Sequence, residues 1–185
     1  MKTLLDEEQL RQGVRELADQ ITARYGQSPL TIIAVMTGSL VLLADLIRLL
    51  EMSLRVGLIQ ASSYRGGTEP SNLVIGDSLS LDIHGRDVLL IDDIFDTGQT
   101  LEAVVARMNS MRPKSLASGV LLFKEGRQRV SYRPDYIAFS IPDEFVVGYG
   151  LDYQDLYRNL PFLAVLEEAD LEHVRALNLA NHSVE

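Results

Sequence analysis

The sequence predicts an α/β protein with a mainly parallel central sheet flanked by helices on both faces. Three observations predict this class. Short apolar runs rich in Val, Ile and Leu alternate with segments of helical periodicity, which is typical of strand–helix–strand crossovers. Hydrophobic residues make up 46% of the 185 residues, which is enough for a substantial core. The chain has no internal repeat, low-complexity tract or Pro/Gly-rich linker, so residues 1–185 are predicted to form a single domain.

The first half of the chain begins this alternation. Asp6 is placed to cap a helix in which Leu10, Val14, Leu17 and Ile21 recur at helical spacing. The elements predicted next are a buried strand over 30–36, a helix over 40–50, a strand over 54–62 and a weaker strand over 73–81. The helix is apolar on nearly all sides and is therefore expected to be buried on most of them.

The second half starts with the clearest buried strand, residues 88–91. A helix over 100–111 follows, with Leu101, Val104 and Met108 on one face. Further strands are predicted over 116–123, 136–141 and 162–166, and a closing helix over 170–178. Ligands of such sheets bind outside the carboxyl ends of the strands. The candidate site segments are therefore residues 36–39, 92–100 and 123–126.

Composition narrows the function. The chain has 17 Lys and Arg against 26 Asp and Glu, a formal net charge of −9. Such a chain is a poor generic binder of nucleic acid or anionic membrane, and we expect neither as a partner. It has no Cys, which excludes thiol nucleophiles, disulfides and Cys-based metal sites. The start of the sequence has no signal or transit pattern, and no apolar run is long enough to span a bilayer, so a cytoplasmic protein is expected.

The segment after the clearest strand carries the strongest chemical signal. Two acids, Asp92 and Asp93, end the strand, a third, Asp96, follows, and small residues lead into a helix. Amides and hydroxyls at a helix N-terminus bind phosphate without any net positive charge, and neighbouring carboxylates accept hydrogen bonds from sugar hydroxyls. The donors are Thr97, Gly98, Gln99 and Thr100. The simpler interpretation is a strand–turn–helix junction with solvated acids, but the ordered string favours a ribose-phosphate site.

This string resembles the phosphoribosyl-pyrophosphate (PRPP) motif of type I phosphoribosyltransferases. Segments 121–124, 134–139, 141–153 and 157–161 continue the match in order. Over roughly residues 30–165 the chain is thereby identified as a member of the hypoxanthine-guanine phosphoribosyltransferase family. The resemblance implies the type I phosphoribosyltransferase fold, with a small hood formed by the N-terminal segment and about residues 140–170. It also implies a flexible lid loop over about residues 63–75, which starts at Ser63 and Tyr64.

The resemblance also implies the reaction. A member of this family works in purine salvage: it transfers the 5-phosphoribosyl group from PRPP to N9 of hypoxanthine or guanine, giving IMP or GMP and pyrophosphate, with Mg²⁺. The transition state is oxocarbenium-like. By similarity, Asp92 and Asp93 hold the ribose hydroxyls, residues 97–100 cradle the 5′-phosphate, and Asp96 faces N7 of the base as general acid/base.

The resemblance assigns the remaining site residues as well. Those that contact the purine are Lys124 at the 6-oxo group, Phe145 and Ile94 on the two faces, and Val146 through its backbone. Those that bind pyrophosphate are Thr37, Gly38 and Arg158. Asp152 is the implied Mg²⁺ ligand, with Asp92 and Asp93 as possible further ligands. Relatives often carry a lysine or arginine at the position of Thr37. Without the resemblance, Lys124 reads as a strand-end lysine, Phe145 as core, and Asp152 with Arg158 as a surface ion pair.

Several other classes of protein share parts of this sequence pattern. A receiver domain carries its acidic pair after the first strand, and a haloacid-dehalogenase-type phosphatase needs an acid where Ile94 stands. An RNA-binding regulator on the same fold needs a basic face, whereas the cations here are scattered among more acids. A xanthine-preferring or uracil-specific transferase is closer, because the residues do not rank hypoxanthine, guanine and xanthine. A homodimer or homotetramer is expected from relatives.

Overall fold

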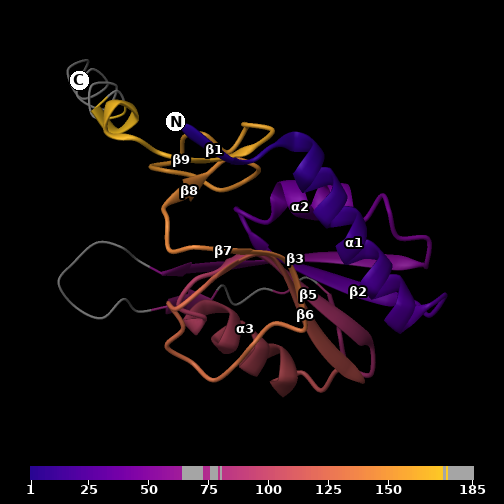
Figure 1. The fold of residues 1–185 in the computed structure, drawn as a ribbon. Coiled ribbons are helices and arrows are strands. Elements are labelled where there is room, and N and C mark those ends of the chain that lie inside the picture. The colour runs from indigo at the N-terminus through magenta and orange to yellow at the C-terminus, as the bar shows by residue number, and fades with distance from the viewer. Residues whose placement is uncertain (64–72, 76–78, 80, 173, 175–185) are drawn as a thin grey trace, which may run out of the picture.

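A computed structural model describes residues 1–63, 73–75, 79, 81–172 and 174. In this part of the chain a six-stranded sheet has the order β4-β3-β2-β5-β6-β7. The neighbouring strands β3, β2, β5, β6 and β7 pair in parallel, and β4 pairs antiparallel with β3 at the edge (Figure 1). The helices are α1 (Glu7–Tyr25), α2 (Leu40–Leu46) and α3 (Gln99–Ser110). The strands are β1 (Lys2–Leu5), β2 (Leu30–Met36), β3 (Leu54–Ser63), β4 (Leu73–Ile75), β5 (Asp87–Phe95), β6 (Ser115–Lys124), β7 (Tyr136–Ile141), β8 (Val146–Val147) and β9 (Leu163–Val165).

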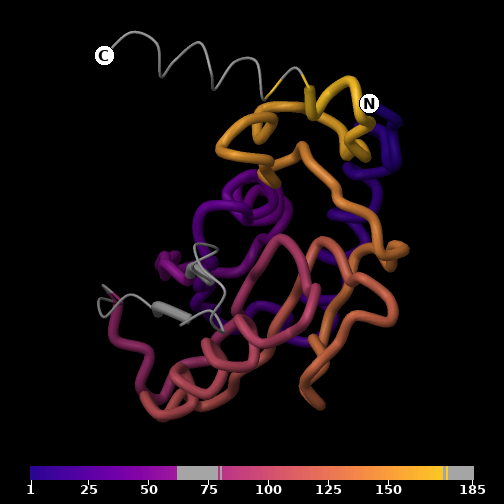
Figure 2. Tube along the Cα trace, turned by 90° about the vertical axis from the view of Figure 1, so that its left-hand side faces the viewer, coloured from indigo at the N-terminus to yellow at the C-terminus, as the bar shows by residue number. Residues whose placement is uncertain are grey.

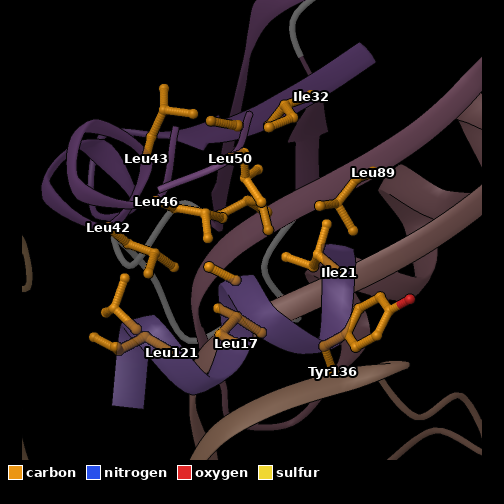
Figure 3. Close-up of a cluster of buried hydrophobic side chains, with 14 of the residues drawn as sticks. Leu17, Ile21, Ile32, Leu42, Leu43, Leu46, Leu50, Leu89, Leu121 and Tyr136 are labelled. Atoms are coloured by element: carbon orange, nitrogen blue, oxygen red, sulfur yellow. The ribbon is translucent and has the colours of Figure 1, made fainter. Parts of the chain in front are cut away.

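Helices cover both faces of this sheet: α1 and α2 lie on one face and α3 on the other (Figure 1). On the first face, Leu17 and Ile21 of α1 and Leu46 of α2 pack with Ile32 and Leu89 of the sheet (Figure 3). A second buried cluster joins α3 to the opposite face. Strands β2, β5 and β6 are therefore held between two layers, which fixes the position of the loops at their carboxyl ends.

A smaller antiparallel sheet, with the order β1-β9-β8, lies on the α2 side of the molecule (Figure 1). Lys2 of β1 and Val146 of β8 both pair with Val165 of β9. The N-terminus and the end of the described chain therefore lie side by side (Figure 2). The segments for which the hood was predicted supply these three strands. Neither β1 nor β8 was predicted, because strands of four and two residues carry too little pattern to detect.

The element predictions hold for most of the central sheet, with one clear error. The strand predicted over 30–36 is β2, and Asp6 caps α1 with a complete capping box to Gln9. The helix predicted over 40–50 is wrong in length and burial. It ends at Leu46, and Leu40 and Leu49 are 47% and 37% exposed. The short helix covers only the neighbouring part of the sheet, so its outer side stays in contact with solvent.

Strand β3 is buried on one face only. Val56 and Leu58 are exposed, whereas Gly57 and Ile59 are buried, and Ile59 packs with the α3 cluster. A strand at this place in the sheet needs a buried residue only where a helix lies above it, and α3 supplies that cover on one face.

The weaker strand and the closing helix are described only in part. Of the strand predicted over 73–81, residues 73–75 form β4, residues 79 and 81 are not in a strand, and 76–78 and 80 lie outside the described residues. The predicted closing helix is seen over residues 168–172 and at 174, and the rest of it lies outside the described residues. None of the helices in the part that the structure describes is long and apolar enough to cross a membrane.

Candidate active site

A cleft of about 1080 Å³ opens where β2, β5 and β6 end. This is the edge at which ligands of parallel sheets bind. It gathers nearly all of the residues that the sequence predicted for the site. Those that line it are Thr37, Gly38, Asp92, Asp93, Ile94, Asp96, Thr97, Gly98, Gln99, Thr100, Lys124, Phe145, Asp152 and Arg158. They come from six separate stretches of the chain.

Three predicted residues stand apart from this set. The side chain of Val146 is buried in the core and does not line the cleft. Ser63 is the last residue of β3 and pairs with Leu73 of β4. Tyr64 and most of the predicted lid loop lie outside the described residues. The structure also brings in Arg127, Arg129 and Asp143, which sequence reasoning missed.

The turn between β5 and α3 has the geometry of an anion cradle. Gly98 is the residue before the first turn of α3 and has φ +83°, where a side chain on this residue would overlap the ring of Phe95. Glycine at this position lets the chain turn tightly between the strand and the helix. The first N–H groups of a helix have no partner within it, and Gln99, Thr100 and Leu101 of the first turn are among the residues that line the cleft. The turn therefore offers backbone donors, backed by the positive end of the helix dipole.

Asp92 and Asp93 form a buried acidic pair at the end of β5. Asp92 is only 6% exposed. Its Oδ1 accepts a hydrogen bond of 3.0 Å from the Asp93 N–H, and Asp93 Oδ1 accepts one of 2.9 Å from the Ile94 N–H. Burial raises the pKa of both carboxyls, and for Asp92 the neighbouring Asp93 charge raises the pKa further. Two carboxylates held this way favour a ligand that donates hydrogen bonds or a cation that offsets their charge.

The loop after β2 lies directly against this pair. A Cβ on Gly38 would overlap the Asp93 carboxylate, so only glycine fits there. Gly150, at φ +100°, packs in turn against the carbonyl oxygen of Gly38. The peptide bond between Met36 and Thr37 is cis. Met36, Thr37 and Gly38 all line the cleft, and the lack of a side chain on Gly38 lets its backbone lie directly against Asp93.

Asp152 and Arg158 meet on the wall of the cleft next to this loop. Arg158 Nη2 lies 2.8 Å from Asp152 Oδ1, and its Nη1 donates to the carbonyl of Gly150 at 2.9 Å. The other oxygen of Asp152 accepts from the N–H of Asp155 at 2.9 Å. The guanidinium is therefore oriented by two acceptors, with about a third of its side chain exposed to the cleft and solvent.

Four charged side chains form an alternating cluster around the end of β6. Lys124 is 7% exposed, and its Nζ lies 3.7 Å from Asp96 Oδ2 and 3.8 Å from Asp143 Oδ1. Arg127 bridges the other oxygens of the same two carboxylates, at 3.1 Å from Asp96 and 3.2 Å from Asp143. The Asp96 contact raises the pKa of Arg127. The cluster therefore has two cations against two carboxylates and no net charge.

An aromatic side chain, Phe145, lines the same cleft as this cluster. Phe145 is 42% exposed, although most large apolar residues of the described chain are buried. Its ring packs edge-to-face against Tyr153, with 5.6 Å between the ring centroids. Ile94, partly buried, lines the same cleft. An exposed aromatic face beside fixed donors is suited to stacking on a flat heterocycle.

The acids of the cleft suit a hard divalent cation that is shared with a ligand. Among the described residues no group of three or more His, Cys, Asp or Glu side chains could hold a metal by itself. Mg²⁺ is commonly bound through one or two carboxylates together with substrate phosphates and water. Asp152 supplies a hard oxygen ligand, and the buried Asp92–Asp93 pair has no ion-pair partner among the described residues. The residues present therefore fit a magnesium ion carried by a phosphorylated substrate.

The cleft thus combines the turn before α3, an acid pair and an exposed aromatic side chain at one edge of a parallel sheet, which is where proteins of this fold class bind their ligands. Residues 1–154 match the family model described as phosphoribosyl transferase domain. The chain belongs to the phosphoribosyltransferase family.

Its relatives narrow this class. The chain is 40% identical over 165 residues to the hypoxanthine-guanine phosphoribosyltransferase of Staphylococcus epidermidis, a match that covers 89% of this chain and 92% of that protein. It is similar to a hypoxanthine-guanine phosphoribosyltransferase structure from Bacillus anthracis with HEPES in the active site, with a TM-score of 0.85 and 39% identity over 90% of this chain and 99% of that one. The hypoxanthine phosphoribosyltransferase of Trypanosoma cruzi gives a TM-score of 0.87 and 36% identity over 95% and 96% of the two chains. The fold class and the family resemblance predicted from the sequence are confirmed.

Proposed function

We propose that this enzyme salvages purines by transferring the 5-phosphoribosyl group of PRPP to N9 of hypoxanthine or guanine, giving IMP or GMP and pyrophosphate. The observation that carries the proposal is the assembly of a phosphate cradle, an acid pair and a lysine on the edge of one cleft. The relatives named above support the choice of substrates, because the matches cover about nine-tenths of the chain. The steps below follow the reacting molecule from its phosphate to its base.

The 5′-phosphate would bind the turn between β5 and α3. Backbone N–H groups of residues 97–100 and the dipole of α3 favour an anion there, although the whole chain carries a net charge of −9. The ribose hydroxyls would donate to Asp92 and Asp93. Among the described residues, one oxygen of each carboxylate accepts a backbone N–H, and a sugar diol would supply further donors to acceptors that are otherwise costly to bury.

The purine would lie between Phe145 and Ile94. Lys124 would donate to the 6-oxo group, which adenine replaces with an amino donor that an ammonium group repels. Asp96, whose carboxylate lies next to Lys124, would take up the proton from N7 as N9 forms its bond to C1′. The contact proposed for Val146 uses its backbone, because its side chain is buried.

Pyrophosphate would leave against the loop after β2. The backbone of Thr37 and Gly38 supplies donors, and Arg158 supplies the charge, since a threonine stands where relatives often have a cation. Asp152, with Asp92 and Asp93 as further candidates, would hold Mg²⁺. When bound, this ion offsets the negative charge of the pyrophosphate. Arg158 is already held by Gly150, so it is pre-positioned for the leaving group.

A homodimer or homotetramer is part of this proposal. The structure of the Trypanosoma cruzi relative concerns the role of its C-terminal region in the oligomeric state and enzymatic activity of that enzyme. Light scattering coupled to size-exclusion chromatography measures the mass of the particle directly. A mass near twice or four times 20.6 kDa would support the proposal, and a mass of 20.6 kDa would contradict it.

The substrate test offers hypoxanthine, guanine, xanthine, adenine and uracil separately with PRPP and Mg²⁺, and follows pyrophosphate release. We expect release with hypoxanthine or guanine and almost none with adenine or uracil. Release mainly with xanthine would make the enzyme a xanthine-preferring transferase instead. No release with any base, together with RNA retention that falls steeply with salt, would favour a regulator on the same fold.

Replacing Lys124 tests the base contact. Lys124→Ala is expected to lower kcat/KM for hypoxanthine and guanine by about 10–100-fold, because one charge-assisted hydrogen bond to the base is lost. The KM for PRPP should stay within about twofold. Steady-state kinetics with each substrate varied in turn separate the effect on the purine from the effect on PRPP. Equal use of adenine by the unsubstituted enzyme would show that the lysine does not select the 6-oxo group.

A further inference from the structure

Arg127 holds a position that the proposed reaction does not use. It lies in the loop after β6, just beyond the candidate segment 123–126, and its side chain is nearly half exposed. Nε donates to Asp96 at 3.1 Å, and Nη1 donates to Asp143 at 3.2 Å. One guanidinium thus joins two carboxylates that stand 47 residues apart in the sequence, and it does so at the mouth of the base pocket.

Lys124 contacts the same two carboxylates, but loosely. Its Nζ lies 3.7 Å and 3.8 Å from the nearest oxygens of Asp96 and Asp143. Hydrogen bonds from an ammonium group to a carboxylate are usually about 2.7–2.9 Å. A buried lysine between two carboxylates is attracted to both, so some other contact must keep the three groups at this wider spacing.

The contact that does so is the guanidinium. Arg127 donates a hydrogen bond to one oxygen of each carboxylate, and its rigid fork fixes both carboxylates in position. Its charge also offsets half of the negative charge that faces Lys124. Gln128 adds a further restraint, since its Nε2 donates to the carbonyls of Lys124 and Asp96 and so ties the two chain segments together.

We propose that Arg127 is a positioning residue that competes with Lys124 for Asp96 and Asp143, and thereby keeps the lysine ammonium free to bind the 6-oxo group of the purine. This inference rests on the proposed function. It also explains why the cluster has two cations for two carboxylates. Without Arg127, two carboxylates would face one ammonium and draw it into short ion pairs. The base would then have to break those pairs before it could bind.

The first test is Arg127→Gln, which keeps a polar side chain but removes the charge. The KM for hypoxanthine should rise about tenfold or more, and kcat should fall, because both Lys124 and Asp96 would be engaged with each other. The KM for PRPP should change less than twofold. Arg127→Lys should give an intermediate effect, because a single ammonium lacks the fork that bridges two carboxylates. Arg11→Gln, at an exposed arginine of α1 that pairs with Glu8, is the matched control and should change neither constant.

The decisive test is the double variant Arg127→Gln/Asp143→Asn. Removing one carboxylate together with one cation restores the charge balance, so it should recover most of the lost affinity for hypoxanthine. If Arg127 only shaped the loop, the additional loss of the Asp143 charge would not restore the affinity for hypoxanthine. Thermal melts of all variants check that the fold is kept, which is expected because the Arg127 side chain is largely at the surface.

The outcomes separate this inference from the proposed function. If the unsubstituted enzyme releases pyrophosphate with a 6-oxopurine but Arg127→Gln keeps its KM for hypoxanthine, the inference is wrong and the function stands. A KM that rises in the single variant and stays high in the double variant also overturns it, since charge balance then plays no part. If the unsubstituted enzyme uses no purine at all, the proposed function and the inference both fail.

Discussion

The two ends of strand β5 carry carboxylates with opposite surroundings. At its start, Asp87 accepts hydrogen bonds from Lys114 Nζ at 2.7 Å and from Ser115 Oγ at 2.6 Å, and these contacts lower the pKa of its carboxyl. At its end, Asp92 is buried and Asp93 partly buried, their Oδ1 atoms accept the backbone N–H groups of Asp93 and Ile94, and burial raises the pKa of both carboxyls. The same residue type on the same strand is thus satisfied at one end and left short of partners at the other.

This difference separates structural acids from acids that are positioned for a ligand. A carboxylate with a cation and a hydroxyl beside it stabilises the fold. A buried carboxylate with a raised pKa costs folding free energy, and a fold that keeps it does so for another reason. The costly acids lie in the cleft, and the satisfied one lies at the far end of the sheet. Substitutions at the two ends should therefore affect activity and stability in opposite ways.

The largest effect is expected at the carboxyl end, from Asp96→Asn. Asparagine cannot take up a proton from the base, so kcat should fall about 10²–10⁴-fold. Binding of the nucleoside monophosphate and the melting temperature should change little, because the side chain is partly exposed. Steady-state kinetics and calorimetric titration with IMP measure the two quantities. Unchanged turnover would remove Asp96 from the mechanism.

A mixed effect is expected from Asp92→Asn. The KM for PRPP should rise about 10–100-fold, because a charged acceptor for the ribose is lost. Stability should increase at pH 7, with the melting temperature rising about 2–4 °C for each kcal/mol gained. A folded-state pKa above the ordinary value near 3.9 means that the wild-type carboxyl destabilises the fold increasingly as the pH rises through that window.

The gain from Asp92→Asn should therefore shrink as the pH falls toward 4, where the carboxyl is protonated in the folded state. Thermal melts of both proteins at pH 7 and pH 4 test this. A variant that is less stable than the wild type at pH 7 would show that Asp92 has a stabilising partner, and the contrast with Asp87 would then be lost.

The smallest effect is expected at the opposite end of the strand, from Asp87→Asn. The loss should be about 1–2 kcal/mol of unfolding free energy, discounted because Lys114 is mostly exposed. Because the pKa of Asp87 is lowered in the folded state, this stabilisation is fully present at pH values above the ordinary pKa near 3.9. It is lost as the pH falls through the lowered pKa. Chemical denaturation at pH 7 and at pH 3 checks the trend. Kinetic constants should be unchanged, and a change in kcat would contradict the assignment of Asp87 to the fold alone.

The contiguous half of the site could be predicted from the sequence. The turn after β5 places its acids, its glycine and its hydroxyl residues within nine positions, and each residue type has a local physical reason to be there. The bounds of β2 and the cap of α1 were predicted for the same reason, since hydrophobic spacing and capping act over a few residues. The prediction for α2 failed because composition cannot show how far a neighbouring helix covers it.

The other half of the site could not be predicted in this way. Arg127 and Asp143 are ordinary charged residues in loops, and their role follows only from their contacts with Asp96 and Lys124. The close approach of Gly38 to Asp93 could not be predicted either, because the loop after β2 and the end of β5 are far apart in the sequence. The short strands β1 and β8 form only because β9 lies between them.

The sequence alone determined the class of fold, the candidate segment for phosphate binding and the family to which the chain belongs, since all three depend on patterns within short stretches. Only the tertiary structure decided which charges face one another in the cleft, which acids are buried and which have partners. Such properties depend on distances of a few ångströms between segments that the chain brings together only when it folds, and the strength of every charged contact varies steeply with that distance and with burial.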